Sequence, residues 1–387
     1  MRRSTERFLT THVGSLVRPP EIADAIRAGG ARDMDARVSR AVRDVVRKQA
    51  EIGIDVVSDG EYSKPNFASY VNERLSGFEL RKEAPIQGIA PSRGRDRKAF
   101  ADFYDEYDRS DPDHQASPGP PATAVCTGPI EYKGQAQVAR DIANLKAAVG
   151  DTGIAEAFLP AVAPGTIEGQ RPNEHYKDSE AYLFAVADAM AHEYRAIVDA
   201  GFVLQVDDPR TAVMYDLQDP APTPQRYREF VELRLAALAR ALKGLPPERV
   251  RYHVCWGSWH GPHTTDVPLA DIVDLILKVP VGAYALEGAN PRHEHEYHVW
   301  ERVKLPAGKI LIPGVIAHTT NTVEHPELIA ERIGRYAERV GRENVIAGSD
   351  CGFAQGALYR RVHPSIMWAK LTALVEGARA ASHRLFA

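Results

Sequence analysis

Three stretches of the chain repeat one order of local signals, and this repeat limits the folds open to it. In each, a helical pattern ends near a glycine, a run rich in β-branched residues follows, and acidic or cysteine residues come next. The runs are 54–61, 202–209 and 345–351, after helices at 36–52, 179–200 and 326–340. This order is typical of repeated βα units with parallel strands.

The same reading gives eight strands. They lie around Val13 and Val56 and at 157–162, 202–206, 250–255, 282–287, 309–316 and 345–351, with further helices at 226–243 and near 268–277. Eight βα units predict a single (βα)8 TIM-type barrel over residues 1–387. A doubly wound open sheet is the alternative. Residues 123–128 form a ninth candidate, which we take as an accessory strand before a helix at 134–148.

One segment breaks this pattern after the second strand. Residues 82–122 are rich in charge, proline and glycine. We expect an insertion of about these bounds, because long segments after barrel strands commonly form lids or binding loops. A solvated or oligomer-contact excursion is the alternative.

Chemically active residues fall at or just after the ends of the predicted strands. They are Ser15, Glu61, Asp207, His253, Cys255, Glu287, His318 and Cys351. In a barrel the carboxyl ends of all strands meet at one face, where catalytic residues lie. The fold prediction therefore gathers these scattered side chains into one pocket.

His253 and Cys255 are the strongest candidates in this group. Residues two apart on a strand share a face, so this imidazole and this thiol project together. With Glu287 and Cys351 they can form a tetrahedral zinc site, in which the carboxylate is an exchangeable ligand and the other three are fixed. A buried cysteine beside a core histidine is the alternative.

Other residues suit a small substrate. A Gly-Ser turn at Ser15 offers backbone N–H groups to an anion, although it can equally be a plain tight turn. Glu61 and Asp207 suit a substrate ammonium. His12 and Lys64 are the candidate bases if the substrate carries an anionic group instead.

Composition excludes several classes of partner. The net charge of −4 argues against nucleic acid and anionic membranes as partners. No apolar run is long enough for a transmembrane helix. Three widely spaced cysteines suit reduced thiols in the cytoplasm better than disulfides. We therefore expect a cytoplasmic protein with small-molecule substrates, and homo-oligomerisation stays open.

Taken together, the motifs resemble the catalytic C-terminal domain of cobalamin-independent methionine synthase, and more closely its short single-barrel relatives, which include epoxyalkane:coenzyme M transferase. The matching marks are Asp59-Gly60-Glu61 with Asn66, Gln205-Val206-Asp207-Asp208-Pro209, His253-Val254-Cys255, Leu286-Glu287, His318 with Asn321, and Asp350-Cys351-Gly352. They span nearly the whole chain in the family's order.

The resemblance implies a barrel that holds Zn²⁺ through His253, Cys255, Glu287 and Cys351. Family members bind a small thiol as a zinc thiolate, which attacks the carbon of an alkyl donor. It also implies that Ser15 lies at the substrate carboxylate, that Glu61 and Asp207 hold its amino group, and that His318 protonates the leaving group.

The chain departs from the synthases in two places. Ile316-Ala317 replaces their acidic residue before the histidine that matches His318, and residues 256–263 lengthen the loop after the zinc pair. We therefore expect zinc-dependent alkyl or methyl transfer to homocysteine or a related thiol. The alternatives are an epoxide-opening thiol transferase or the reverse lyase, and a metal-free barrel that acts as a decarboxylase or binding protein.

Overall fold

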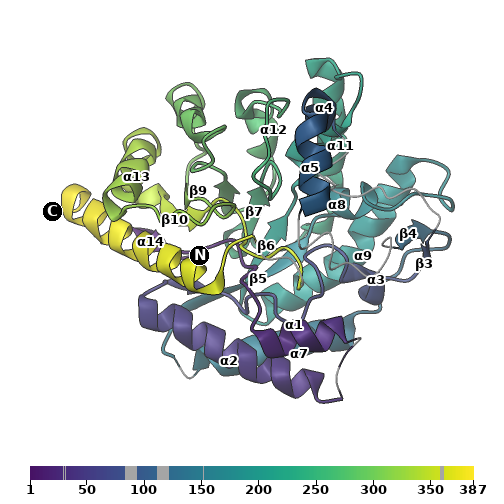
Figure 1. Ribbon diagram of the computed structural model, residues 1–387, viewed down its shortest axis with the longest axis horizontal. Helices are drawn as coiled ribbons and strands as arrows, with labels where there is room; N and C mark the ends of the chain where they lie inside the picture. The colour runs from purple at the N-terminus through teal and green to yellow at the C-terminus, as the bar shows by residue number, and fades with distance from the viewer. Residues whose placement is uncertain (29, 31, 83–93, 111–121, 151, 358–360) are drawn as a thin grey trace.

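The predicted barrel is confirmed in the computed structural model, which describes residues 1–28, 30, 32–82, 94–110, 122–150, 152–357 and 361–387. Eight parallel strands pair in the order β1-β10-β9-β8-β7-β6-β5-β2. Their bounds are β1 Leu9–Thr10, β2 Val56–Val57, β5 Glu156–Val162, β6 Val203–Asp207, β7 Val250–Val254, β8 Ala283–Leu286, β9 Ile310–Ile316 and β10 Ile346–Ser349. Helices surround the sheet (Figure 1).

The two end strands, β1 and β2, close the sheet without forming a regular ladder. The Asp55 amide donates to the Thr10 carbonyl at 3.2 Å, and the Thr11 hydroxyl donates to the Val56 carbonyl at 2.9 Å. Both strands are only two residues long. These bonds bridge the gap, so the sheet is a nearly closed barrel rather than an open, doubly wound one.

The long helices of the barrel, apart from the last one, follow the predicted spans closely. They are α2 Met34–Ile52, α7 Gln135–Gly150, α9 Ser179–Asp199, α11 Pro224–Ala241, α13 Pro326–Val340 and α14 Pro364–Leu385. The last of these was not predicted. The helix expected near 268–277 is instead the 3-10 turn η2 Leu269–Asp271 followed by α12 Val273–Ile276.

Shorter helical segments fill the connections. They are α1 Pro20–Arg27, α3 Val71–Arg74, α8 Pro164–Glu168, α10 Arg210–Leu217, η1 Pro247–Arg249, η3 Glu294–Glu301 and η4 Arg342–Asn344. Within the described ranges, none of the helices is long and apolar enough to cross a membrane.

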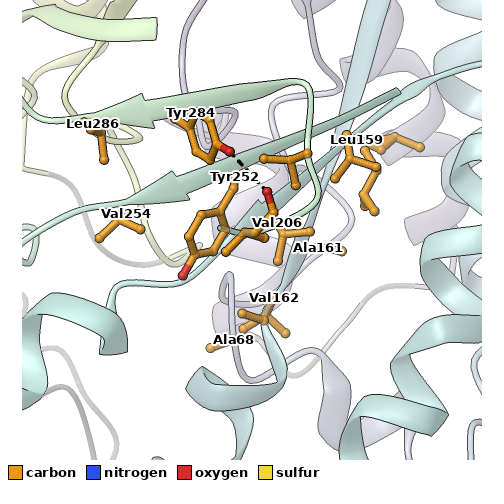
Figure 2. Close-up of a cluster of buried hydrophobic side chains, with 14 of the residues drawn as sticks. Ala68, Leu159, Ala161, Val162, Val206, Tyr252, Val254, Tyr284 and Leu286 are labelled. Carbon is orange, nitrogen blue, oxygen red and sulfur yellow. Dashed lines mark hydrogen bonds between the residues drawn. The ribbon is translucent and has the colours of Figure 1, made fainter. Parts of the chain in front are cut away.

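Side chains alternate along β7 and β8, and this alternation decides which of their residues reach the site. Tyr252 and Val254 of β7 pack with Tyr284 and Leu286 of β8 in the large apolar layer between sheet and helices (Figure 2). The residues between them face the barrel interior, as expected for a period of two. His253 therefore points inward.

An arginine fills the middle of the barrel interior. Arg251 is 2% exposed, donates to the Thr11 hydroxyl at 3.0 Å and the His12 carbonyl at 2.7 Å, and stacks 3.4 Å from the centre of the Phe158 ring. Burial lowers its pKa to about 9. The barrel is thus filled below the site by a polar group with specific partners.

The accessory strand is confirmed at β4, Thr123–Cys126, which pairs antiparallel with β3, Phe78–Arg81. The predicted insertion at about 82–122 lies partly outside the described residues. Its described part holds α4 Arg95–Ala99 and α5 Ala101–Ser110. The Asp96 amide donates to the Asp216 carboxylate at 2.9 Å, which ties α4 to the end of α10. The insertion as one unit remains a prediction.

We expect Arg251→Ala to destabilise the protein by about 3 kcal/mol or more, because it leaves a cavity and buried acceptors without donors. Urea unfolding monitored by circular dichroism measures this. The exposed Arg43→Ala on α2 is the control and should stay within about 0.5 kcal/mol of the parent. Equal stability of the two variants would contradict a structural role for Arg251.

Candidate metal centre and substrate cavity

Three of the four predicted zinc ligands meet at the carboxyl end of the barrel. One nitrogen of His253 and the sulfurs of Cys255 and Cys351 all lie within 4.8 Å of one another. His253 and Cys255 come from the end of β7, and Cys351 follows β10. Two other strands separate β7 from β10 in the sheet, so it is the curvature of the barrel that joins them.

The spacing of the two thiols fits a metal ion. Their sulfurs are 3.7 Å apart, whereas a disulfide needs about 2.05 Å. Two sulfurs each about 2.3 Å from one tetrahedral zinc ion lie about 3.8 Å apart. Both ring nitrogens of the buried His253 have no hydrogen-bond partner among the described residues, which leaves a lone pair for a metal.

The thiols also influence each other directly. Their mutual contact lowers the pKa of Cys351 and raises that of Cys255, because one remaining S–H stabilises a neighbouring thiolate. Without a metal ion the pair therefore favours a single negative charge. A cation would allow both sulfurs to be deprotonated together.

Glu287, the fourth predicted ligand, is buried beside this group but is not part of the three-residue cluster. Its Oε1 accepts a hydrogen bond from the Trp256 amide at 2.7 Å, and its Oε2 accepts one from the Asn290 side chain at 3.1 Å. Its carboxylate is thus hydrogen-bonded to two protein groups, and it lies outside the cluster formed by His253 and the two cysteines.

Two other carboxylates that follow Glu287 in the sequence, those of Glu294 and Glu296, are paired elsewhere. Glu294 pairs with Arg332 and Arg335, and Glu296 pairs with His293. Both residues lie in the 3-10 helix η3.

A cavity of about 400 Å³ opens onto the metal-binding cluster. Its wall contains most of the residues that the strand ends predicted. These are Ser15, Glu61, Asp207, His253, Cys255 and Cys351. Side chains that the strand-end argument did not select complete it, namely Asn66, Ser69, Gln170, Ser258, Trp259, Gln355 and Arg361. The cavity is large enough for a small amino acid and a second small group.

Glu61 has the geometry of a strained functional residue. It adopts a positive φ of 59°, which is uncommon outside glycine and concentrates at active sites. Its Oε2 is buried without a hydrogen-bond partner and lies 4.0 Å from the Lys64 ammonium. This carboxylate can accept a donor from a ligand.

Asp207 is the second acid of the cavity. Its Oδ1 accepts from the Gln205 side chain at 2.7 Å. Burial raises its pKa to about 8, and the charge of Glu61 adds to this effect. A cationic group between the two acids would relieve both the desolvation and the repulsion.

The turn at Ser15 is built by close packing. Gly14 has a φ of 115°, and a Cβ there would lie 2.6 Å from the Pro160 ring. The Ser15 hydroxyl donates to the Ala354 carbonyl, and the Ser15 carbonyl accepts from the Phe353 amide at 2.7 Å. The turn is therefore fixed against the segment that follows Cys351.

His12 and Lys64, the predicted bases, do not line the cavity. The ring nitrogens of His12 bond to the Gln49 side chain at 2.7 Å and the Gly14 amide at 3.0 Å, and burial lowers its pKa to about 4. The Lys64 ammonium donates to the Pro160 carbonyl at 2.5 Å and lies over the Tyr70 ring. Both side chains thus bond to neighbouring protein groups and do not face the cavity.

His318 is buried next to the cluster, at 2% exposure, and burial lowers its pKa. Neither of its ring nitrogens has a hydrogen-bond partner among the described residues. Like His12 and Lys64, His318 is not among the residues of the cavity wall.

No protein-family model matches the chain. Known proteins resemble it both in sequence and in fold. A methionine synthase from Sulfolobus acidocaldarius is 27% identical over 351 residues, which cover 89% of this chain and 85% of that protein. One from Saccharolobus solfataricus is 23% identical over 385 residues, covering 97% and 95%.

The fold has a solved counterpart. A B12-independent methionine synthase from Shewanella sp. W3-18-1, solved with selenomethionine, has a TM-score of 0.73 and 20% identity, covering 98% of this chain and 99% of that one. The resemblance inferred from the motifs is thereby confirmed: over nearly its whole length the chain is similar to methionine synthases, and it shares the fold of a B12-independent one.

Proposed function

We propose that the protein transfers a methyl group to the sulfur of homocysteine, or of a closely related small thiol, at a zinc ion held by His253, Cys255 and Cys351. One observation carries the proposal: a two-sulfur, one-imidazole cluster opens onto a cavity that also bears two buried carboxylates. Similarity to methionine synthases over nearly the whole chain supports the same reaction.

The residues fit the metal and its chemistry. Zinc, when bound, would supply the positive charge that makes a substrate thiol lose its proton near neutral pH. Glu287 suits a fourth, exchangeable ligand, because the Trp256 amide and Asn290 already satisfy its carboxylate whenever it is not coordinating. Its departure would therefore leave no unpaired buried charge.

The acids and the turn provide the binding groups for an amino acid. A substrate ammonium between Glu61 and Asp207 would pair with the free Oε2 of Glu61 and offset the burial of both carboxylates. The substrate carboxylate would then lie toward the Ser15 turn, away from the two acids. This orientation directs a short thiol side chain at the cluster.

His318 is the proposed proton carrier for the leaving group. Burial keeps its pKa low, so the ring is neutral near pH 7 and has one N–H to donate and one nitrogen to accept. Because neither nitrogen has a protein partner among the described residues, a proton can pass without breaking an existing bond.

A second candidate is epoxide opening by a thiol that carries a sulfonate. The observation that favours it is Arg361 in the cavity wall, where its Nε donates to the Ser258 carbonyl at 3.0 Å and its Nη1 to the Tyr107 hydroxyl. This guanidinium gives the cavity wall a cationic group, which is opposite in charge to the two acids in the same wall.

Cys351→Ser should lose most of the metal, because one of the two sulfur ligands is removed. We expect about one zinc ion per chain in the parent protein, measured by plasma mass spectrometry. Cys126→Ser is the matched control, since Cys126 is a buried free cysteine that is not in the cluster and should keep full zinc. Full zinc in Cys351→Ser would remove Cys351 from the site.

Glu287→Gln should retain zinc and change how readily a thiol enters. X-ray absorption should count two sulfur neighbours in the resting protein and three with the cognate thiol, at a lower thiol concentration in the variant because an amide is the weaker ligand. Glu294→Gln, whose carboxylate pairs with Arg332, is the control. An unchanged titration in Glu287→Gln would show that Glu287 is not the labile ligand.

Glu61→Gln should raise the KM for homocysteine about tenfold or more, because a hydrogen bond to a charged group contributes about 1.5–3 kcal/mol. The affinity for 4-mercaptobutyrate, which is homocysteine without the amino group, should not change. Glu73→Gln, an exposed acid on α3, is the control. Activity with 2-mercaptoethanesulfonate and an epoxide, but none with homocysteine, would favour the second candidate.

A further inference from the structure

A second cluster of titratable side chains lies outside the cavity. The Nδ1 of His263 and the Nε2 of His293 bond to one oxygen of Asp266 at 2.8 and 2.9 Å. The Nδ1 of His293 bonds to Glu296 at 2.8 Å. Neither histidine is more than 3% exposed. We call these four residues the His–Asp–His–Glu network.

The bonding pattern fixes the protons in the network. The remaining nitrogen of His263 faces the Trp259 carbonyl at 3.2 Å, so all four ring nitrogens face oxygen atoms and all donate when both carboxylates are ionised. Both rings are then imidazolium ions, balanced by two carboxylates. Although burial acts against it, bonding to Asp266 and Glu296 raises the pKa of His293 to about 10.

The distances also favour hydrogen bonds over a second metal ion. Two ligand atoms each about 2.05 Å from a tetrahedral zinc ion lie about 3.3 Å apart, which is longer than either bond to Asp266. Each charged ring is also covered by an indole. The ring centres of Trp256 and His293 are 4.4 Å apart, and so are those of Trp259 and His263. This arrangement is that of a cation–π pair.

The network holds the loop of residues 256–267, which directly follows Cys255. Within the loop, His263 of the network bonds to the Trp259 carbonyl. Just after the loop, Glu296 accepts a hydrogen bond from the Leu269 amide at 2.7 Å. His263 has a φ of 56°, and it shares positive φ with Glu61 alone among the described non-glycine residues. Such backbone strain persists only where the surroundings over-determine it.

The insertion holds the same loop from the outer side. Asp96 of α4 accepts from the His263 amide at 3.2 Å and from the Thr264 amide at 2.9 Å. Tyr104 of α5 accepts from the Trp259 indole at 3.3 Å and donates to Asp96 at 3.1 Å. The loop is thus fixed between the network and the described part of the insertion.

Ser258 is the residue of this loop that contacts the metal-binding cluster. Its hydroxyl donates to the sulfur of Cys351 at 3.2 Å. The neighbouring Gly257, with a φ of 103°, allows the Trp259 ring to fold back over it, because a Cβ there would lie 2.1 Å from that ring. The loop therefore aims one hydroxyl at one ligand sulfur.

We propose that Ser258 is a positioning residue whose hydroxyl, held in place by the His–Asp–His–Glu network, weakens the electron donation of the Cys351 sulfur to the metal ion. A hydrogen bond to a thiolate withdraws charge from it, so it tunes the metal as outer-shell partners do. The claim about the metal rests on the proposed function, whereas the hold of the network on the loop does not.

The experiment uses the full chain with cobalt(II) in place of zinc, because cobalt reports its sulfur ligands through a charge-transfer absorption band. Ser258→Ala should shift this band to lower energy, since the sulfur becomes a stronger donor. Ser258→Thr keeps the hydroxyl and should restore the parent band. In the zinc enzyme, kcat should change about three- to tenfold in Ser258→Ala, with KM nearly unchanged.

The network is tested separately by amide hydrogen exchange over residues 256–267. His293→Gln should raise this exchange at least tenfold and shift the cobalt band as Ser258→Ala does. Glu296→Gln keeps the shape of the network with one charge less and should give a smaller change in the same direction. Ser258→Ala should leave the exchange unchanged.

Each contrary result has a distinct meaning. An unmoved band in Ser258→Ala, or failure of Ser258→Thr to restore it, would overturn the tuning role. Unchanged loop exchange in both network variants would overturn the hold on the loop, and a second cobalt ion that is lost in His293→Gln would make the cluster a metal site. A parent protein that binds no metal contradicts the proposed function, while the exchange result still decides the role of the network.

Discussion

The site depends on the side-chain alternation of β7. Tyr252 and Val254 are wholly buried in the apolar layer beneath the helices, so Arg251, His253 and Cys255 must face the barrel axis. A register shift of one residue would bury the imidazole among aliphatic side chains and expose tyrosine to the interior, which the packing of both layers opposes. The apolar layer, which never touches a ligand, therefore determines which polar residues do.

The two polar clusters differ in how completely their buried atoms are hydrogen-bonded. Every ring nitrogen of the His–Asp–His–Glu network has an acceptor. In contrast, His253, His318 and Glu61 keep buried atoms without partners among the described residues. Each such atom costs about 1–3 kcal/mol of folding free energy, a cost that a metal ion and a charged substrate would offset. The first cluster suits a structural role, and the second suits binding.

Local patterns could predict much of this, because β-branched runs, helix-ending glycines and strand-end residues are all features of neighbouring positions. They gave the barrel, and they gave most of the residues that line the cavity. They could not show that Gln49 of α2 bonds to His12, since that contact joins segments 37 residues apart. Asp266 and His293 are separated by 27 residues, so their pairing required the fold. Ser258 carries no local signal at all.

The loop that follows Cys255 and the described part of the insertion are joined to each other at the cavity. The loop of residues 256–267 supplies Ser258 and Trp259 to the wall, and α4 and α5 bond that loop through Asp96 and Tyr104. Arg361 links the same elements by bonding Ser258 and Tyr107. The same cavity wall contains Glu61 and Asp207, which the motif resemblance predicted. If these two acids hold an amino acid as proposed, specificity for the second substrate is expected to arise from the loop and from the described part of the insertion.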